Sequence, residues 1–261
     1  MKKNLKTYIS LILIVIAAAA IIVFDVCNFV YTDDDILNSL LDGIIPRLIA
    51  GGALIGVSIL LDYKQSLTPS LKQLPFHLLW CIPCFLVVFA NFPFTALITG
   101  SAQILRSDLI ALFLLKCLSI GLMEEVLFRG LFQQTIAQTF ENKPHGQFFT
   151  VLITSAVFGL IHFFNLFAGA GVGDTFLQVG YSFLIGAMLS AVIIKTNNLW
   201  LCVLLHTIFD VGGNIITDLG KGHFQDTGFW IFTAVAGIIC LIHILYFLIE
   251  QDRKTDVNKN E

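Results

Sequence analysis

Charged side chains are scarce in this chain. Asp, Glu, Lys and Arg make up 13% of its 261 residues, whereas soluble domains carry about a quarter. Hydrophobic residues make up 57%. This balance does not fit a soluble globular domain and predicts several membrane-spanning segments. The chain also has no basic cluster interleaved with aromatic residues, so no nucleic-acid partner is expected.

Two common hydrolase signatures are missing as well. No H-E-x-x-H sequence is present, which argues against a zincin-like or site-2-type metalloprotease, and no G-x-S-x-G is present for a serine nucleophile. Gly171-Val-Gly-Asp174 resembles the G-x-G-D signature of intramembrane aspartyl proteases. Those enzymes also need a Tyr-Asp pair, which this chain lacks. A tight turn is therefore the better interpretation of this segment.

The six cysteines indicate no disulfide framework, because most of them lie within apolar runs, where a free thiol packs as a small hydrophobic group. Trp80-Cys81-Ile-Pro-Cys84 resembles a thioredoxin-type tetrapeptide. A membrane thiol–disulfide oxidoreductase using Cys81 and Cys84 is therefore kept as an alternative. The apolar surroundings and Pro83 favour packing cysteines instead.

Eight apolar segments approach the length of about 20 residues that crosses a bilayer. The fold class predicted is all-α, a polytopic transmembrane bundle forming one integral membrane domain over residues 1–261. The first segment follows Met1-Lys2-Lys3 and could be a signal peptide, but a retained span is preferred. The eight segments are Tyr8–Phe24, Ile44–Leu61, Phe76–Phe92, Leu109–Phe132, Phe148–Phe167, Phe176–Ile194, Leu199–Ile216 and Phe229–Ile249.

Basic residues divide unequally between the two ends of these segments. With eight spans both termini lie on one side, and only Arg106 and Lys221 fall in the opposite loops. The positive-inside rule then places both termini in the cytoplasm of a multi-pass cell-membrane protein. The basic residues on the side of the termini are Lys2, Lys3, Lys6, Lys64, Lys72, Lys143, Lys195, Arg253, Lys254 and Lys259.

The segment 109–132 carries the most informative residues, because a charge at membrane depth costs several kcal/mol (roughly 2.5–3.5) and marks a candidate functional site. Glu125 and Arg129 are four residues apart, so they can pair on one helix face. Glu124 is left to face another direction. Lys116, two turns earlier, could pair with a carboxylate or extend its ammonium group toward the interface, and a packing role is favoured.

Two further segments carry histidines, His162 and the i, i+4 pair His206–Asp210, with Asn214 one turn beyond. A lone histidine in a span is usually an interhelical hydrogen-bonding group, and an isolated Glu–Arg pair is usually structural. Three spans that all supply such residues favour a catalytic site. Counting residues from the termini's side places His162 about 10 Å deeper than Glu124 and His206, which is the weakest point of this geometry.

These residue types suit the activation of water. Glu124 can act as general base beside the two imidazoles for attack on an amide carbonyl. Glu124, His162 and His206 are also an acceptable zinc set with one position left for water. A divalent metal and a metal-free mechanism both remain open. Either one needs a water-filled cavity, expected to open from the cytoplasmic half.

At these residues the chain resembles the CPBP family of CAAX proteases and bacteriocin-processing enzymes. The family pattern, E-E-x-x-x-R, F-x-x-x-H and H-x-x-x-N/D in this order, is matched over a core of about residues 109–216. The matching residues are Glu124, Glu125 and Arg129, then Phe158 and His162, then His206 and Asp210.

This resemblance implies an intramembrane endopeptidase in which Glu124 activates water and His162 and His206 assist it. Glu125, Arg129 and Phe158 would support the site. Asp210 stands where many members have an Asn assigned to the oxyanion, and an Asp must be protonated to donate that hydrogen bond. The implied partners are the bilayer and a membrane-associated peptide or protein. A non-enzymatic bacteriocin-immunity or regulatory protein is the other alternative.

Overall fold

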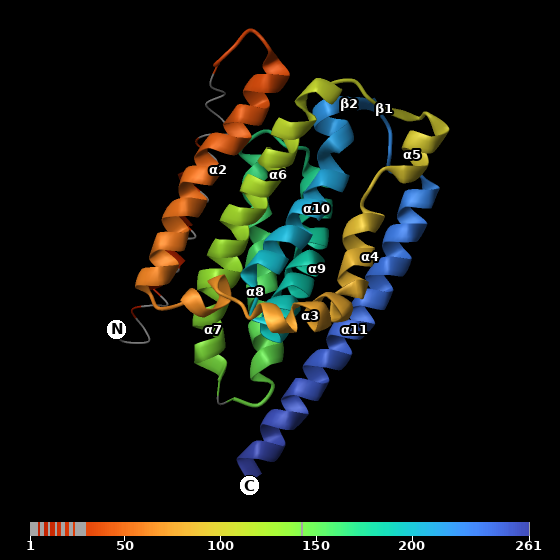
Figure 1. Ribbon diagram of the computed structural model, residues 1–261. Coiled ribbons are helices and arrows are strands. Elements are labelled where there is room, and N and C mark those ends of the chain that lie inside the picture. Colours follow the sequence, from red (N-terminus) through yellow and green to blue (C-terminus); the bar gives the residue numbers. More distant parts are fainter. Residues whose placement is uncertain are drawn as a thin grey trace.

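The computed structural model describes residues 30–141 and 143–260, with the backbone alone for 254–260, and scattered positions before residue 30. In the predicted first span, 8–24, ten of the 17 residues are described and all ten are helical, whereas Cys27 lies outside the described residues. The remaining elements form an all-helical polytopic bundle, which confirms the predicted fold class (Figure 1).

The helices that build the bundle are α2 (Asp35–Leu60), α3 (Leu74–Trp80), α4 (Ile82–Ala90), α5 (Phe94–Thr99), α6 (Ile110–Glu125), α7 (Gln133–Phe140), α8 (Gly146–Leu160), α9 (Val172–Thr196), α10 (Leu199–Leu219) and α11 (Thr227–Asn260). Short 3-10 turns are η1 (Lys64–Leu67), η2 (Leu71–Gln73), η3 (Ser107–Leu109) and η5 (Ile161–Leu166), and η4 (Val126–Phe132) is a π-helix.

Five helical segments of the described part are long and apolar enough to cross a membrane, namely α2, α8 with η5, α9, α10 and α11. The segment with α3 and α4 adds a sixth if this pair, bent by 61°, counts as one span. The bend lies at Cys81, just before Pro83 in the first turn of α4. Proline lacks the N–H that would continue the hydrogen-bond ladder, so a break is expected there.

The predicted segment 109–132 is not one regular α-helix. It contains η3, α6 and then the seven-residue π-helix η4, from which α7 continues. All seven π-helical residues are buried. A π-helix widens the turn and is found mostly at functional sites. Here it directly follows the two glutamates and contains Arg129.

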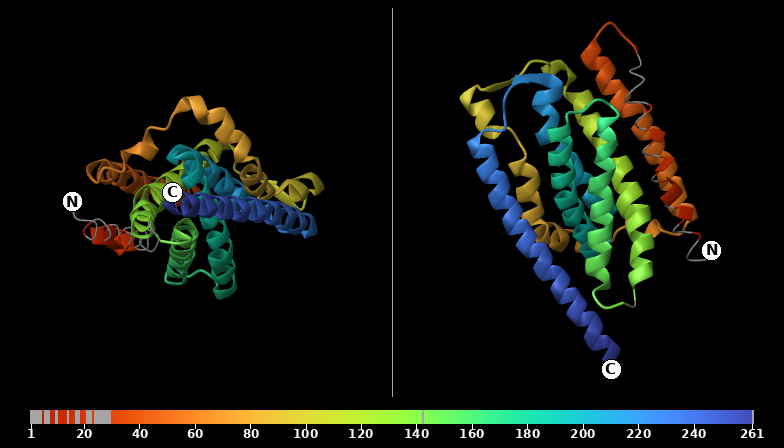
Figure 2. Two further views of the ribbon diagram at one scale, coloured as in Figure 1. Left: turned by 90° about the horizontal axis from the view of Figure 1, so that it is seen from below. Right: turned by 180° about the vertical axis from the view of Figure 1, so that it is seen from behind.

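The central helices α6, α8, α9 and α10 pack against one another, with α2 lying along α6 on one flank and α4 and α11 together on the other (Figures 1 and 2). At the end of the bundle opposite the C-terminus, the strands β1 (Ala102–Ile104) and β2 (Gly220–Gly222) form an antiparallel pair that was not predicted. The pair connects the segment before α6 to the end of α10.

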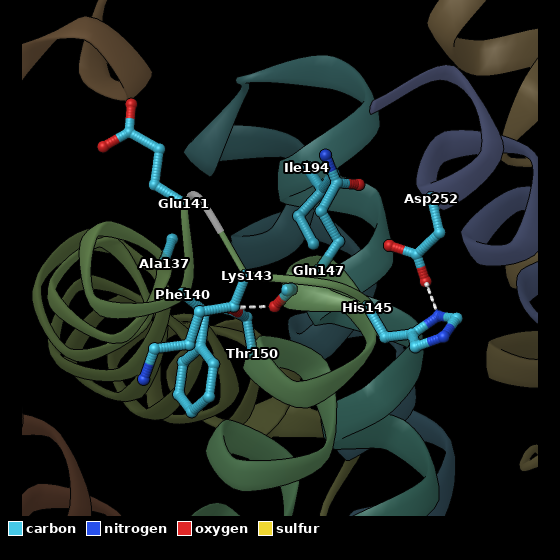
Figure 3. A pocket seen from close by; sticks show the side chains of 10 residues that line it. Ala137, Phe140, Glu141, Lys143, His145, Gln147, Thr150, Ile194 and Asp252 are labelled. Carbon is cyan, nitrogen blue, oxygen red and sulfur yellow. Dashed lines mark hydrogen bonds and ion pairs between the residues drawn. The ribbon is translucent and has the colours of Figure 1, made fainter. Parts of the chain in front are cut away.

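At the C-terminal end, the turn between α7 and α8 contacts α11. His145 Nδ1 lies 3.2 Å from Asp252 Oδ2. The two side chains border a cavity of about 270 Å³ that Lys143 and Gln147 also line (Figure 3). This contact connects the last described helix to the four-helix core.

Candidate active site

A buried ion pair lies in the middle of the bundle. Arg129 Nη1 donates to Glu125 Oε1 at 2.9 Å, and the two side chains are 1% and 0% exposed. The pairing predicted from the i, i+4 spacing is thus confirmed. Arg129 Nη2 donates to the carbonyl of Gly186 on α9 at 3.1 Å. Partners on two helices compensate a guanidinium that would be very costly to bury alone.

Glu125 also fixes the orientation of His206. His206 Nδ1 lies 2.7 Å from Glu125 Oε1. Because an ionised carboxylate only accepts hydrogen bonds, Nδ1 is assigned the proton. Nε2 then faces the other two carboxylates, at 3.8 Å from Glu124 Oε2 and 3.6 Å from Asp210 Oδ2. A carboxylate behind a histidine sets its tautomer in the same way at many catalytic and metal sites.

His162 is held by its own turn of helix. Its Nδ1 lies 2.8 Å from the Phe158 carbonyl, so Nδ1 is the donor, and Nε2 is 3.5 Å from Ser182 Oγ. The Phe158 ring contacts both imidazoles edge to face, with centroid distances of 5.3 Å to His162 and 5.9 Å to His206. The Arg129 guanidinium carbon lies 4.4 Å from the centroid of the same ring. Phe158 therefore separates the two imidazoles and packs against the ion pair.

One cavity of about 380 Å³ brings the predicted residues together. Its wall includes Glu124, His162, His206, Asp210 and Asn214, supplied by α6, η5 and α10. Glu124 retains 21% exposure of its side chain, whereas Glu125 is fully buried and does not line the cavity. Glu125 and Arg129 thus act on the cavity only through His206 and Phe158.

The cavity lies toward the end of the bundle opposite the C-terminus. Its wall reaches from Phe158 and Ile185 at mid-bundle to Ala168 and Ala170, in the connection from η5 to α9 at that end (Figures 1 and 2). On the other side of the site, the chain after Glu125 is buried throughout η4. The opening of the cavity toward the cytoplasmic half stays a prediction.

Several wall residues were not predicted. Gln178, Tyr181 and Ser182 come from α9, and Arg47 comes from α2. Gln178 Oε1 accepts a hydrogen bond of 2.8 Å from Asn165 Nδ2, which ties α9 to η5. A signal was available in the sequence, since Gln178 and Ser182 are polar, four residues apart and in an otherwise apolar span.

Lys116 differs from its predicted packing role. Its Nζ lies 2.7 Å from Asp218 Oδ2, with both side chains less than one-fifth exposed. The ion pair joins α6 to α10 between the cavity and the β1–β2 pair. No short-range pattern links the two residues, because they are 102 positions apart.

The residues as arranged do not fit a resident metal ion. Throughout the part of the chain with described side chains, no group of three or more His, Cys, Asp or Glu is placed to hold one. His162 Nε2 lies 3.5 Å from Ser182 Oγ, and a serine hydroxyl is not one of the usual zinc ligands. We therefore derive no step through a metal.

The thioredoxin-like motif that contains Cys81 and Cys84 does not lie on the wall of this cavity. Cys81 and Cys84 are free and 0% exposed; Cys81 lies at the bend between α3 and α4, and Cys84 lies in the first turn of α4. A thiol–disulfide oxidoreductase needs an accessible thiolate. This arrangement supports the interpretation of the two cysteines as packing residues.

Comparison with known families agrees with the geometry of the cavity. Residues 106–212 match the family model described as type II CAAX prenyl endopeptidase Rce1-like. Over this segment the chain is similar to that family. The match confirms the resemblance to CAAX proteases and includes Glu124, Glu125, Arg129, His162 and Asp210. A search of curated proteins found no match to the chain. The matched segment covers α6 to α9 and the first two-thirds of α10, and hence the helices that supply most of the cavity wall.

Proposed function

We propose that this protein is an intramembrane endopeptidase that hydrolyses peptide bonds of membrane-associated substrates, with Glu124 as the base that activates water. One observation carries the proposal: Glu124, His162 and His206 line a single cavity. The Rce1-like match supports the same class of reaction.

The reaction proposed is a metal-free hydrolysis. His162 and His206 both carry a proton on Nδ1, so each turns its Nε2 toward the cavity. The attacking water donates one hydrogen bond to Glu124 and the other to His162 Nε2. Glu124 takes a proton from this water as its oxygen bonds to the substrate carbonyl carbon. The C–N bond then breaks, and the proton held by Glu124 passes to the leaving nitrogen. The products are a new carboxyl terminus and a new amino terminus.

The remaining residues position these three. Glu125, paired with Arg129, fixes the His206 ring, and Phe158 separates the imidazoles. Asp210 and Asn214 lie on the same face of α10 and line the cavity near the carbonyl to be attacked. We assign them the binding of the carbonyl oxygen, a role in which Asp210 contributes a hydrogen bond only when it is protonated.

The substrate proposed is a segment that becomes unwound within the cavity, because a hydrogen-bonded helix hides its carbonyls from attack. The segment enters at the end of the bundle where Ala168 and Ala170 lie. If both termini are cytoplasmic, as the distribution of basic residues predicts, that end faces away from the cytoplasm. Peptides on the outer side of the membrane then become the first candidates.

The test compares the membrane and secreted peptides of cells that express wild-type protein, E124Q or E141Q at equal levels. Glu141 is an exposed carboxylate outside the cavity and serves as the matched control. Loss of a catalytic base lowers the rate by about 10²–10⁴-fold. We expect one or more cleaved peptides to be present with wild type and E141Q and missing with E124Q. Identical peptides in all three strains would favour the non-enzymatic immunity or regulatory alternative.

A further inference from the structure

A second polar cavity, far from the catalytic one, lies where α3 meets the end of α9. It measures about 570 Å³, and its wall consists of Gln73, Phe76, His77, Leu79, Trp80 and Lys195. No acidic side chain belongs to this wall. The amide, imidazole, indole and ammonium groups together provide several hydrogen-bond donors around a single fixed positive charge.

Two of these groups lack a polar partner in the part of the chain that the structure describes. Lys195 takes part in none of the ion pairs found there, and its Nζ lies 5.9 Å from the Phe247 ring centroid. His77 is 8% exposed, and its Nδ1 has no hydrogen-bond partner among the described residues. Lys195 is exposed to the surroundings of the bundle, whereas His77 Nδ1 is a buried atom whose lost hydrogen bond a polar ligand can restore.

The surroundings of the cavity are those of a membrane interface. The segment that includes η2 and α3 runs across the bundle axis near the C-terminal end (Figure 1). It exposes large apolar side chains outward, with Leu71 and Phe76 each 75% and Leu79 65% exposed. A short helix with apolar residues outward and polar residues inward is suited to lie at the level of lipid headgroups.

We propose that this cavity binds the phosphate headgroup of an anionic phospholipid. Lys195 contacts the phosphate, and His77 and Gln73 donate to its oxygens or to headgroup hydroxyls. The acyl chains lie over Phe76 and Leu79. Basic pockets between transmembrane helices commonly bind such headgroups. The proposal is independent of the proteolytic function, since none of these residues lines the catalytic cavity.

The experiment is native mass spectrometry of the full chain, released from detergent with defined lipid added. Wild type, K195Q, K195R and K143Q are compared with phosphatidylglycerol and with phosphatidylcholine. Lys143 is the matched control, because it lies at the same end of the bundle but borders a different cavity. One lysine near an anionic surface is worth about a fivefold change in affinity. We expect phosphatidylglycerol to bind about fivefold more weakly to K195Q, with K195R and K143Q close to wild type.

Competition with glycerol 3-phosphate and inorganic phosphate identifies the ligand. Under the proposal, neither displaces phosphatidylglycerol at millimolar concentration, because the acyl chains contribute most of the affinity. Displacement by either one would overturn the assignment to a lipid in favour of a soluble phosphate. Equal retention of phosphatidylglycerol by wild type and K195Q, or equal binding of phosphatidylcholine and phosphatidylglycerol, would overturn the site itself.

Discussion

At the scale of single residues, Glu124 and Glu125 are neighbours in the sequence with opposite environments. Glu124 lines the cavity, while Glu125 is enclosed by Arg129 and His206. Their consecutive positions on a helix explain this, because neighbours point about 100° apart around the axis. We therefore expect Glu124 to act on the substrate and Glu125 to act through His206.

Replacing Glu125 tests this difference. E125Q leaves the Arg129 guanidinium buried without a charged partner, which typically costs about 3–5 kcal/mol of unfolding free energy. The double variant E125L/R129M removes both charges. Its loss of unfolding free energy should therefore be well below the sum of the losses in E125L alone and R129M alone. Denaturant unfolding in detergent micelles measures the unfolding free energy of each variant. Strict additivity would show that the two side chains do not interact.

Unfolding free energy should also distinguish E124Q from E125Q. Glu124 is partly exposed and has no ionic partner on its own helix, so E124Q should unfold within about 0.5 kcal/mol of wild type. It should nevertheless lose cleavage. A large loss of stability in E124Q would mean that Glu124 supports the structure rather than the reaction.

At the scale of elements, close packing of α6 on α10 sets the distance between the glutamates and His206. A Cβ atom added to Gly121 would lie 2.9 Å from Thr207 Oγ1 and 3.3 Å from the Val203 carbonyl. G121A should therefore push the two helices apart, at a cost of about 1–3 kcal/mol, and lower cleavage.

Gly56 on α2 provides the matched control. Nothing lies within 4 Å of a Cβ atom added there. G56A should be neutral or stabilising, by up to about 1 kcal/mol, since alanine favours a helix. The two variants are compared by thermal unfolding and by cleavage rate. Equal effects of both would refute the account of the α6–α10 contact.

An ion pair fixes the start of α2 near the β1–β2 pair. Asp34 accepts hydrogen bonds from Arg106 and from the first backbone N–H groups of α2, and these lower its pKa to about 2. The folded-state pKa lies below the ordinary value of 3.8, so the stabilisation is present above about pH 4 and is lost as the pH falls toward 2.

Unfolding midpoints measured between pH 5 and pH 2 test this contact. Wild type should lose stability over that range more steeply than D34N, which has no carboxylate to protonate at this position. D62N, at an exposed turn, serves as the control and should keep the wild-type slope. Parallel curves for wild type and D34N would contradict the assignment.

Much of this element-level organisation could be predicted from the sequence, and the exceptions have physical causes. Seven of the eight predicted apolar segments coincide with described helices. The start of α2 was placed too late, because the N-cap Asp34 was not recognised as the start signal. The π-helix η4 could not be foreseen, since its residues have the same apolar composition as an ordinary helix. Despite the depth difference expected for His162, His162 and His206 line the same cavity.

At the scale of the whole molecule, the catalytic cavity opens toward the end of the bundle that carries β1, β2 and the η5–α9 connection. Whether this end is the cytoplasmic one, as predicted for the opening of the cavity, depends on the orientation of the bundle in the membrane.

Single-cysteine labelling determines which side of the membrane this end faces. In a background without native cysteines, A170C reports the mouth of the cavity and T68C reports the opposite end, since both positions are exposed. A membrane-impermeant maleimide added to intact cells should label A170C and leave T68C unlabelled if the termini are cytoplasmic. The reverse pattern would place the termini outside and the cavity toward the cytoplasm.

The most direct test of the account is hydrolysis in water enriched in ¹⁸O by purified protein in liposomes with a library of membrane peptides. We predict that wild type and E141Q generate new C-termini carrying ¹⁸O, whereas E124Q does so at least about 100-fold more slowly. Cleavage by E124Q at the wild-type rate would contradict the claim that Glu124 activates the attacking water.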